Sequence, residues 1–487
     1  MKRLISSFIL ISLLAGLASC GSESGSNDIS AEQSSAGGAS DETETADSAI
    51  SDNLPDKDYN GYDFRILMRC TPIWTKEMFV DEATGDVVDD AVYRRNQIVS
   101  ERFGVNFTLI ESSNTNYELD GVNAILAGDD AYDLIAAHGH AAFTYAQQGL
   151  LLDWKTELPY VDLDKPWWDQ DARDSFEINN KLYAMVGDLS YNALAYSDCM
   201  LFNKNLFDKY NEEYPFQKVI DGTWTFDEFS RLVKVCSADL NGDNKLDPND
   251  DLYGYATYIW VGPVEVLYTG GGRVMTKNAD GGLELCYNTE RNIDVYNTFF
   301  NLLKDDSCYL EPDRSDYQSL RRTMFFEGRA LMIDGNLNEV SYMRDMKDDF
   351  GIVPWPKFDS SCDGYAANVD AGTNIYLVPI TVSDPERNSI ILEALSAEGN
   401  RIVIPAYYET ALQKKYTRDD ISVKMIDIIR ESRIFDIGYY YRDIGYFSWG
   451  GRALCDYPDH SFASFYAKNE PTALATIKEV NENYGKQ

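Results

Sequence analysis

The stretch from Tyr62 to Ala136 decides the fold, because short apolar runs alternate in it with amphipathic helical patterns. Its successive segments are YDFRIL at 62–67, DDAVYRRNQIVSERF at 89–103, VNFTLI at 105–110 and YDLIA at 132–136. The second segment repeats its apolar residues at a helical period, whereas the other three read as strands. Strands that alternate with helices predict a mainly parallel sheet covered by helices on both faces.

The rest of the chain continues this alternation. Further helices are expected before Gly128, over 141–148 and after Thr225, where Thr225 and Glu228 have the spacing of a capping box. Further strands are expected at 328–333, 350–354 and 375–379. Ligand sites in such sheets form at the carboxyl ends of strands, so the loops that follow strands are where binding residues are sought.

The first twenty residues have the layout of an export signal that ends at a cysteine. Lys2 and Arg3 precede an apolar run at 4–17 that is too short to span a membrane permanently, and small residues precede Cys20. A chain cleaved before Cys20 resembles a bacterial lipoprotein, which implies a signal peptide over 1–19 and an acyl (palmitate) anchor on Cys20. The alternative is an ordinary cleaved signal with a cysteine nearby.

Residues 20–57 are expected to form a disordered tether, because they are rich in Ser, Gly, Ala and acids and contain no aromatic residue. The expected location is therefore extracytoplasmic, on the outer face of the cell membrane. From Asp58 onward the chain is long enough for two substantial lobes with cores of their own.

Charge and cysteine content narrow the classes of partner. The net charge of −37 argues against nucleic acid and anionic headgroups as partners. The seven cysteines after Cys20 are scattered without a CxxC pair, so buried free thiols are expected, although the sequence leaves disulfides open.

A series of short blocks carries a resemblance to a known family. The blocks are DDAVYRRN (89–96), YDLI (132–135), GLLLD (149–153), FNKNLF (202–207), TWTFDEF (223–229), EGRALM (327–332) and FGIVPWP (350–356). In order and spacing they are similar to the extracellular solute-binding proteins of ABC importers, family 1, the group that includes maltodextrin- and oligosaccharide-binding proteins. The resemblance covers roughly Tyr59 to Tyr484.

The resemblance implies a two-lobe α/β fold of the periplasmic-binding-protein type, with crossing hinge strands and a central ligand cleft. The first lobe is expected at 58–188 plus 373–412, and the second at 189–372 plus 413–487. A ligand that touches both lobes only in the closed form shifts the population toward that form. The membrane permease then recognises the closed form. A non-catalytic monomer that carries an oligosaccharide or other carbohydrate is the expected function.

Sugar clefts need aromatic faces for the C–H side of a pyranose and planar polar groups for its hydroxyls. Alignment with the family places the following residues at the ligand: Trp74, His138, His140, Asp188, Trp260, Asp334, Asn336 and Trp449. The family's usual aromatic-plus-acid arrangement is absent beside the histidines, which argues against a long linear glucan. Core packing is the alternative for the tryptophans and is at least as strong for Trp167 and Trp168.

The loop DLNGDNKLDPND at 239–250 has the spacing of an EF-hand or dockerin calcium loop. Its predicted ligands are Asp239, Asn241, Asp243, Lys245 through its carbonyl, Asp247 and Asp250. Asn244 replaces the usual turn glycine, and Asp250 replaces the usual bidentate glutamate. Structural calcium is expected, and a solvated acidic turn is the alternative.

Two other functions compete with solute delivery. A surface glycoside hydrolase needs two carboxylates about 5–9 Å apart across a cleft, and the sequence singles out no such pair. A non-catalytic carbohydrate-binding surface lipoprotein is the other alternative. Gly270-Gly271-Gly272 is interpreted as a turn rather than a phosphate cradle, because no P-loop lysine follows it.

Overall fold

The computed structural model describes residues 50–485 apart from 72–74, 114–116, 314–318, 344 and 414–419. The chain divides into two compact units, Met1–Ser51 and Asp52–Gln487, and the helices and strands below all belong to the second. Within the described residues, no helix is both long and apolar enough to cross a bilayer.

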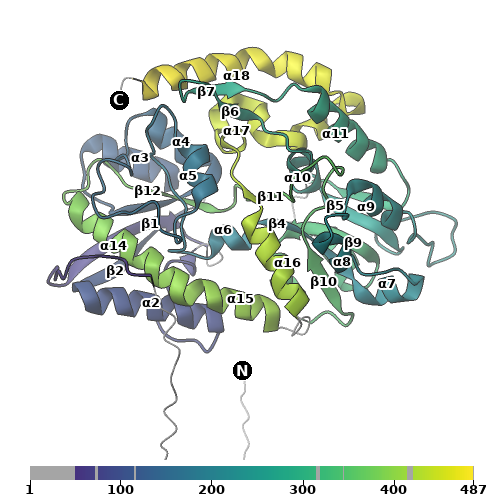
Figure 1. Cartoon of the computed structure of the whole chain (residues 1–487), viewed down its shortest axis with the longest axis horizontal. Coiled ribbons are helices and arrows are strands. Elements are labelled where there is room, and N and C mark those ends of the chain that lie inside the picture. The colour runs from purple at the N-terminus through teal and green to yellow at the C-terminus, as the bar shows by residue number, and fades with distance from the viewer. Residues whose placement is uncertain are drawn as a thin grey trace, which may run out of the picture. The chain divides into compact units, whose positions relative to one another are not determined.

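Two main β-sheets organise the second unit (Figure 1). The four-stranded sheet has the order β12-β3-β1-β2, and the five-stranded sheet has the order β10-β4-β9-β5-β8. Their strands are β1 (Tyr62–Arg69), β2 (Val105–Ser112), β3 (Leu134–His138), β4 (Asp198–Asn203), β5 (Tyr253–Tyr258), β8 (Cys308–Glu311), β9 (Ala330–Asn336), β10 (Phe350–Val353) and β12 (Asn374–Leu377). Two short pairs are β6 (Met275–Lys277) with β7 (Leu283–Leu285), and β11 (Ala367–Asn368) with β13 (Arg433–Ile434).

The strands are less uniformly parallel than the sequence pattern predicts. β1 pairs in parallel with β2 and β3, and β5 with β8 and β9. In contrast, β12 runs antiparallel to β3, and β4 runs antiparallel to β9 and β10. The chain enters β12 and β4 after leaving the other sheet, so neither strand follows the helical crossover that makes neighbouring strands parallel.

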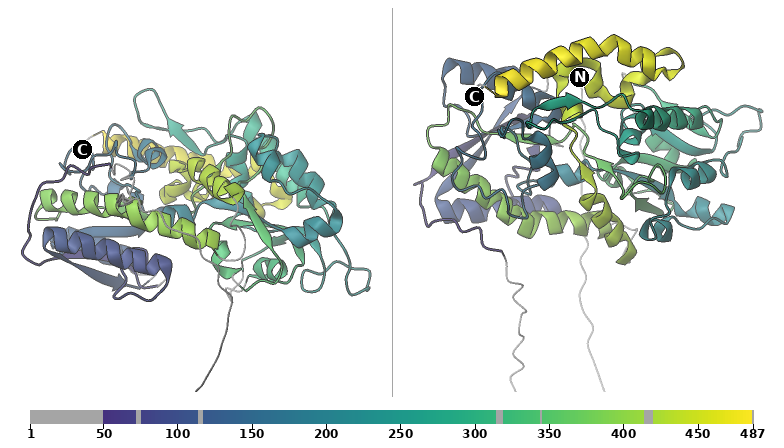
Figure 2. Two further views of the ribbon diagram at one scale, coloured as in Figure 1. Left: turned by 60° about the horizontal axis from the view of Figure 1, so that its bottom comes forward. Right: turned by 45° about the horizontal axis from the view of Figure 1, so that its top comes forward.

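Helices cover these sheets. In chain order they are α2 (Val87–Phe103), α3 (Tyr117–Ala127), α4 (Gly139–Gln147), α5 (Gln170–Phe176), α6 (Asn192–Ala195), α7 (Lys204–Tyr210), α8 (Phe216–Ile220), α9 (Phe226–Val233), α10 (Gly262–Thr269), α11 (Glu290–Leu302), α12 (Leu320–Phe326), α13 (Glu339–Tyr342), α14 (Pro385–Glu398), η1 (Gly399–Val403), α15 (Ile404–Gln413), α16 (Asp420–Glu431), α17 (Ile437–Tyr440), η2 (Arg442–Asp456), η3 (Pro458–His460) and α18 (Phe462–Tyr484). The continuous run α14-η1-α15 lies along α2 (Figure 2, left). The C-terminal α18 contacts α4, η2 and β7.

The strongest sequence patterns are confirmed, but the predicted capping box is wrong. The helix after Thr225 begins at Phe226, yet Thr225 makes no side-chain cap bond. Glu228 pairs instead with Arg231 and Lys218, so the predicted capping box does not form. α2 shows the usual caps, with Asp86 accepting from backbone N–H groups of the first turn and Gly104 in the left-handed region at φ 60°.

The predicted tether extends too far. Residues Asp52 to Lys57 belong to the folded unit, where Asp52 pairs with Arg102 and Lys57 pairs with Glu386 at 3.1 Å. Leu54 packs against the main core. Composition alone misplaced this boundary, because one apolar residue and two ion pairs are enough to hold so short a segment.

A buried charge network closes one end of the five-stranded sheet. Arg321 is 2% exposed and pairs with Asp334 at 3.2 Å and Glu339 at 2.9 Å. Burial raises the pKa of Asp334 to about 6, although the guanidinium beside it acts in the opposite direction. Loss of the arginine would leave Asp334 buried without a cation and Glu339 with Arg322 alone, at 2.6 Å, which is costly.

A pair of carboxyls is buried where β4 meets α10. Asp198 and Glu265 are 2% and 0% exposed, and the backbone N–H of Asn368 donates to Glu265 Oε2 at 2.9 Å. Burial raises the pKa of both carboxyls well above the ordinary value, and the Coulombic repulsion of Glu265 adds to the shift at Asp198. Each carboxyl therefore keeps its proton to a higher pH than an exposed carboxyl does.

Replacing Arg321 by Met should lower the free energy of unfolding by about 3–5 kcal/mol, because the buried Asp334 loses its cation and Glu339 keeps only Arg322. Urea denaturation followed by tryptophan fluorescence measures the change. Arg231→Met is the matched control, since the side chain of Arg231 is 46% exposed in its pairs with Glu212 and Glu228. The control should cost about 1 kcal/mol or less. Equal losses in both variants would contradict the assigned network.

Glu265→Gln should stabilise the protein increasingly as pH rises above about 5. A carboxyl whose pKa is higher in the folded chain contributes stability at low pH that is lost as pH rises through the folded value. Glutamine keeps the shape without that loss. Calorimetric Tm values measured across the pH range test this, with Glu284→Gln on exposed β7 as the control. A pH-independent difference between Glu265→Gln and wild type would refute the pairing.

Candidate functional site

Trp260 and Trp449 come together although they are far apart in the chain. Trp260 follows β5 and Trp449 lies in η2, and their ring centroids are 5.5 Å apart at 53°. The indole N–H of Trp260 donates to Asp313 Oδ1 at 2.8 Å, and the hydroxyl of Tyr258 donates to the same oxygen at 2.7 Å. Arg452 bonds the other oxygen of Asp313 at 3.1 Å. We call these five residues the Asp313 cluster.

The Asp313 cluster is partly open to solvent and electrically balanced. Trp260 and Trp449 are half-buried, and the neighbouring Tyr446 is 47% exposed with its ring edge-on to Trp449. The guanidinium carbon of Arg452 lies 5.2 Å from the ring centroid of Trp260. Burial acts to raise the pKa of Asp313, but hydrogen bonds from Tyr258, Arg452 and Trp260 outweigh it and the pKa is lowered. The ionised form of Asp313 is therefore favoured, and it pairs with Arg452.

The two predicted histidines lie where β3 ends. Their ring centroids are 5.5 Å apart, and Nδ1 of His138 accepts the backbone N–H of His140 at 3.1 Å, which caps α4. His140 packs edge-on against Tyr439 of α17 at 5.1 Å. Desolvation lowers the pKa of His140 to about 4 and that of His138 well below the ordinary value. Both rings are therefore neutral at physiological pH.

One consecutive segment contacts both groups. α17 and η2 pack against α4, which begins at the histidines, and η2 also packs against α10, which follows Trp260. Nε2 of His140 is buried and has no hydrogen-bond partner within the described chain. This arrangement offers aromatic faces from one group and an unused polar atom from the other.

Two further polar residues beside the histidines escaped the sequence reasoning. Arg69 ends β1 and donates to the carbonyl of Gly372 at 2.8 Å and to Asn374 Oδ1 at 3.0 Å. Asp370 accepts from the backbone N–H of Gly372 at 2.7 Å and from the hydroxyl of Tyr439 at 3.2 Å. Neither belongs to a motif, so position at a strand end was the one available signal.

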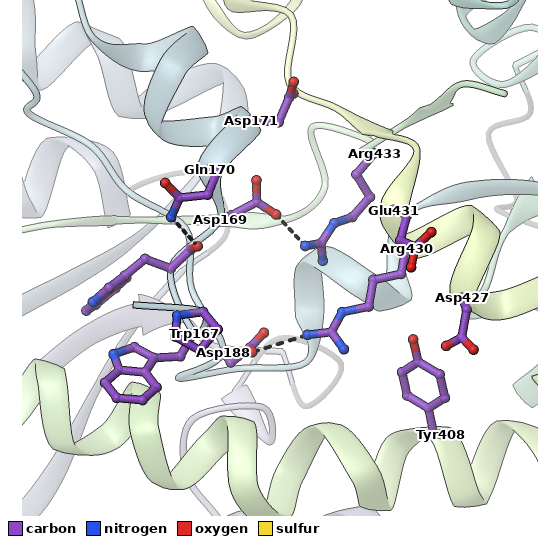
Figure 3. Close-up of a pocket in the computed structure, with 12 residues that line it drawn as sticks. Trp167, Asp169, Gln170, Asp171, Asp188, Tyr408, Asp427, Arg430, Glu431 and Arg433 are labelled. Carbon is purple, nitrogen blue, oxygen red and sulfur yellow. Dashed lines mark hydrogen bonds and ion pairs between the residues drawn. The ribbon is translucent and has the colours of Figure 1, made fainter. Parts of the chain in front are cut away.

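Asp188 lies in a different place, a pocket of about 400 Å³ (Figure 3). It pairs with Arg430 at 3.3 Å and accepts from Asn400 at 2.7 Å, while Asp169 pairs with Arg433. The pocket thus joins residues near the first sheet to α16, which packs on β10 of the second. Asp188 is not brought to the Asp313 cluster.

The other predicted residues have varied positions. Asp334 is fully buried in the Arg321 network, and Asn336 is half-buried at the end of β9 opposite Asp198. Trp74 lies outside the described residues. Trp167 and Trp168 are 3% and 2% exposed and donate their indole N–H groups to Glu393, as the core-packing interpretation predicts.

The calcium ligands predicted for the loop at 239–250 stay a prediction. Asp239 accepts the backbone N–H groups of Gly242 at 2.6 Å and Asn244 at 2.7 Å, and Asn244 is left-handed at φ 66°. Asp250 is exposed, whereas the buried Asp251 accepts two loop N–H groups. No three His, Cys, Asp or Glu residues in the described part of the chain are grouped to share an ion. Asp251 is thus the acid that the sequence reasoning missed here.

Comparison with known proteins identifies the fold. No protein-family model matches the chain, and no curated protein matches it. A cyclo/maltodextrin-binding protein complexed with maltotetraose is 13% identical with a TM-score of 0.55, over 87% of this chain and 96% of its own. An ABC substrate-binding protein of Listeria monocytogenes in complex with cycloalternan is 16% identical with a TM-score of 0.50, over 87% and 97%. UgpB of Mycobacterium tuberculosis in complex with glycerophosphocholine is 14% identical with a TM-score of 0.52, over 87% and 97%.

These likenesses confirm the predicted fold class, an α/β fold with two main sheets as in the solute-binding proteins of ABC transporters. The first two of these structures are named as binding proteins.

Proposed function

We propose that this protein is the solute-binding component of an ABC importer and carries an oligosaccharide or other carbohydrate to a membrane permease. The Asp313 cluster is the observation that carries the carbohydrate assignment. Half-buried indole rings held by a carboxylate and a guanidinium offer a flat apolar face beside fixed polar groups, which is what a pyranose requires.

The charges around this surface support an uncharged guest. Arg452 is occupied by Asp313 and by Asp456 at 2.9 Å, so its charge is balanced within the protein. His138 and His140 are neutral, because burial disfavours their protonated forms. Nε2 of His140 has no hydrogen-bond partner in the described chain and is buried in this conformation, so it would bond a sugar hydroxyl only after a movement that exposes it.

The comparisons support this proposal through two bound ligands, maltotetraose and cycloalternan. A third protein of the same fold binds glycerophosphocholine, so the fold alone does not select the ligand class. The local chemistry of the Asp313 cluster is what supports a carbohydrate as the ligand.

The proposed mechanism is closure of two lobes, 58–188 plus 373–412 and 189–372 plus 413–487, around the sugar. Strands β1–β3 and β12 in one sheet, with the strands between them in the other, support this division. Ligand that contacts both lobes stabilises the closed form by its differential affinity.

Isothermal titration against a panel of neutral oligosaccharides should reveal at least one ligand. Trp260→Ala and Trp449→Ala should each weaken it about tenfold or more, because truncation of a buried aromatic anchor costs about 2 kcal/mol. Tyr342→Ala, which removes a 45% exposed ring of α13, is the control and should bind as wild type does.

Absence of binding to every sugar would sink the carbohydrate assignment, and wild-type affinity in both tryptophan variants would remove the Asp313 cluster from the site. Release of shorter products during the same incubations would favour the glycoside hydrolase alternative instead.

We also propose that the mature chain begins at an acylated Cys20. The support is the sequence pattern: a basic start at Lys2 and Arg3, an apolar run at 4–17 and small residues before the cysteine. A single binding protein held at the membrane stays close to its permease.

In cells given labelled palmitate, wild-type protein should carry the label and sediment with membranes. Cys20→Ser should lose the label and appear in the soluble extracytoplasmic fraction, whereas Cys70→Ser, at an exposed thiol of the folded unit, should behave as wild type does. Membrane association of Cys20→Ser equal to wild type would exclude the anchor.

A further inference from the structure

A second pocket, of about 350 Å³, lies between the glycine turn that follows α10 and the loop at 361–366. None of its lining residues belongs to the Asp313 cluster or to the histidine pair. Two guanidinium groups, those of Arg273 and Arg291, line it. This is a local concentration of positive charge on a chain with 80 acidic and 43 basic residues.

Arg273 forms no direct ion pair within the described chain. Its Nη1 donates to the carbonyl of Gly272 at 2.8 Å, and its guanidinium carbon lies 5.7 Å from the ring centroid of Tyr268. Among the described residues it has no carboxylate within ion-pair distance. Asp363, the acid that lines the same pocket, is exposed and pairs with neither arginine within that part of the chain. The carboxylates of Asp436, Asp171 and Glu265 act on Arg273 only over a longer distance, so its guanidinium keeps N–H groups that can bind an external anion.

Arg291 forms the fixed wall of the pocket. Its Nη1 binds Asp359 at 2.5 Å, its Nε donates to the carbonyl of Gly270 at 3.3 Å, and its Nη2 donates to Cys362 Sγ at 3.3 Å. Asp359 also accepts the backbone N–H of Ser361 at 2.9 Å. The carboxylate of Asp359 is therefore bound to Arg291 and to the loop backbone.

The loop opposite these arginines supplies free donors and space. The backbone N–H groups of Gly364 and Tyr365 make no hydrogen bond within the described chain, and both residues line the pocket. A Cβ atom added at Gly364 would meet no heavy atom within 4 Å. Backbone N–H groups that converge with a guanidinium fork are the usual means of binding oxyanions.

We propose that this pocket binds the oxyanion group, a phosphate, sulfate or carboxylate, of a small organic molecule distinct from the transported sugar. Arg273 provides the charged fork and the 364–365 backbone provides further donors. The volume exceeds what an inorganic ion fills, which leaves room for an organic part. Ile434 of β13 and Ala366, which precedes β11, line the pocket, so the occupant lies beside that strand pair.

Thermal unfolding of the mature protein in sodium phosphate, sulfate or acetate, with chloride at equal ionic strength as reference, tests this. At least one oxyanion should raise Tm saturably, by about 2 °C or more, because a ligand of the folded state stabilises it by mass action. Arg273→Gln should abolish the saturable rise. Arg94→Gln is the matched control, since Arg94 is an exposed arginine of α2 without an ion pair in the described chain, and it should keep the rise.

Gly364→Asp gives an independent variant. The new side chain has room, and its negative charge should weaken oxyanion binding tenfold or more without unfolding the protein. A rise that grows linearly with salt, or one that persists in Arg273→Gln and Gly364→Asp, would show general ionic effects and would overturn the proposal. Sugar binding by titration is read separately, so the two proposals can fail independently.

Discussion

Three donors from two distant parts of the chain converge on the carboxylate of Asp313, and the functional surface depends on that convergence. Tyr258 ends β5, Trp260 follows it, and Arg452 comes from η2 near the end of the chain. Because the carboxylate accepts from all three, the indole of Trp260 is fixed and the ring of Trp449 is brought beside it. Rigid aromatic faces cost little entropy on binding, which is what a capture site for a weakly interacting sugar needs.

The pairing of charges at the candidate binding surface is a second feature of the structure. A chain with a net charge of −37 pairs the charges of its candidate binding surface internally and keeps the two histidines there neutral by burial. An uncharged guest then meets no electrostatic penalty. The pocket at Arg273 differs, because Arg273 forms no ion pair with a carboxylate in the described chain, and this contrast is why the two sites are assigned to ligands of different charge.

Much of the fold could be read from the sequence, because hydrophobic periodicity reports burial directly. The strands near Tyr62, Val105 and Leu134 follow from that pattern, whereas the antiparallel pairing of β4 and β12 does not, since it arises from where the chain enters each sheet. The predicted capping box at Thr225 does not form, because Glu228 pairs with cationic side chains that the local pattern does not reveal.

Site residues were harder to predict than elements. Trp260 and Trp449 could each be named from the sequence, but their contact depends on the tertiary structure. Asp313 is one of 80 acidic residues, and its sequence neighbours do not distinguish it from the others. The choice of Asp250 over Asp251 in the loop at 239–250 shows the same limit: spacing cannot say which of two adjacent acids turns inward.

A crystal structure of the protein with its tightest-binding sugar would test the central claim most directly. The account predicts a pyranose ring in van der Waals contact with the indoles of Trp260 and Trp449, with a hydroxyl near Nε2 of His140. Sugar density confined to the pocket at Asp188 and Arg430, with both indoles left in solvent, would contradict it.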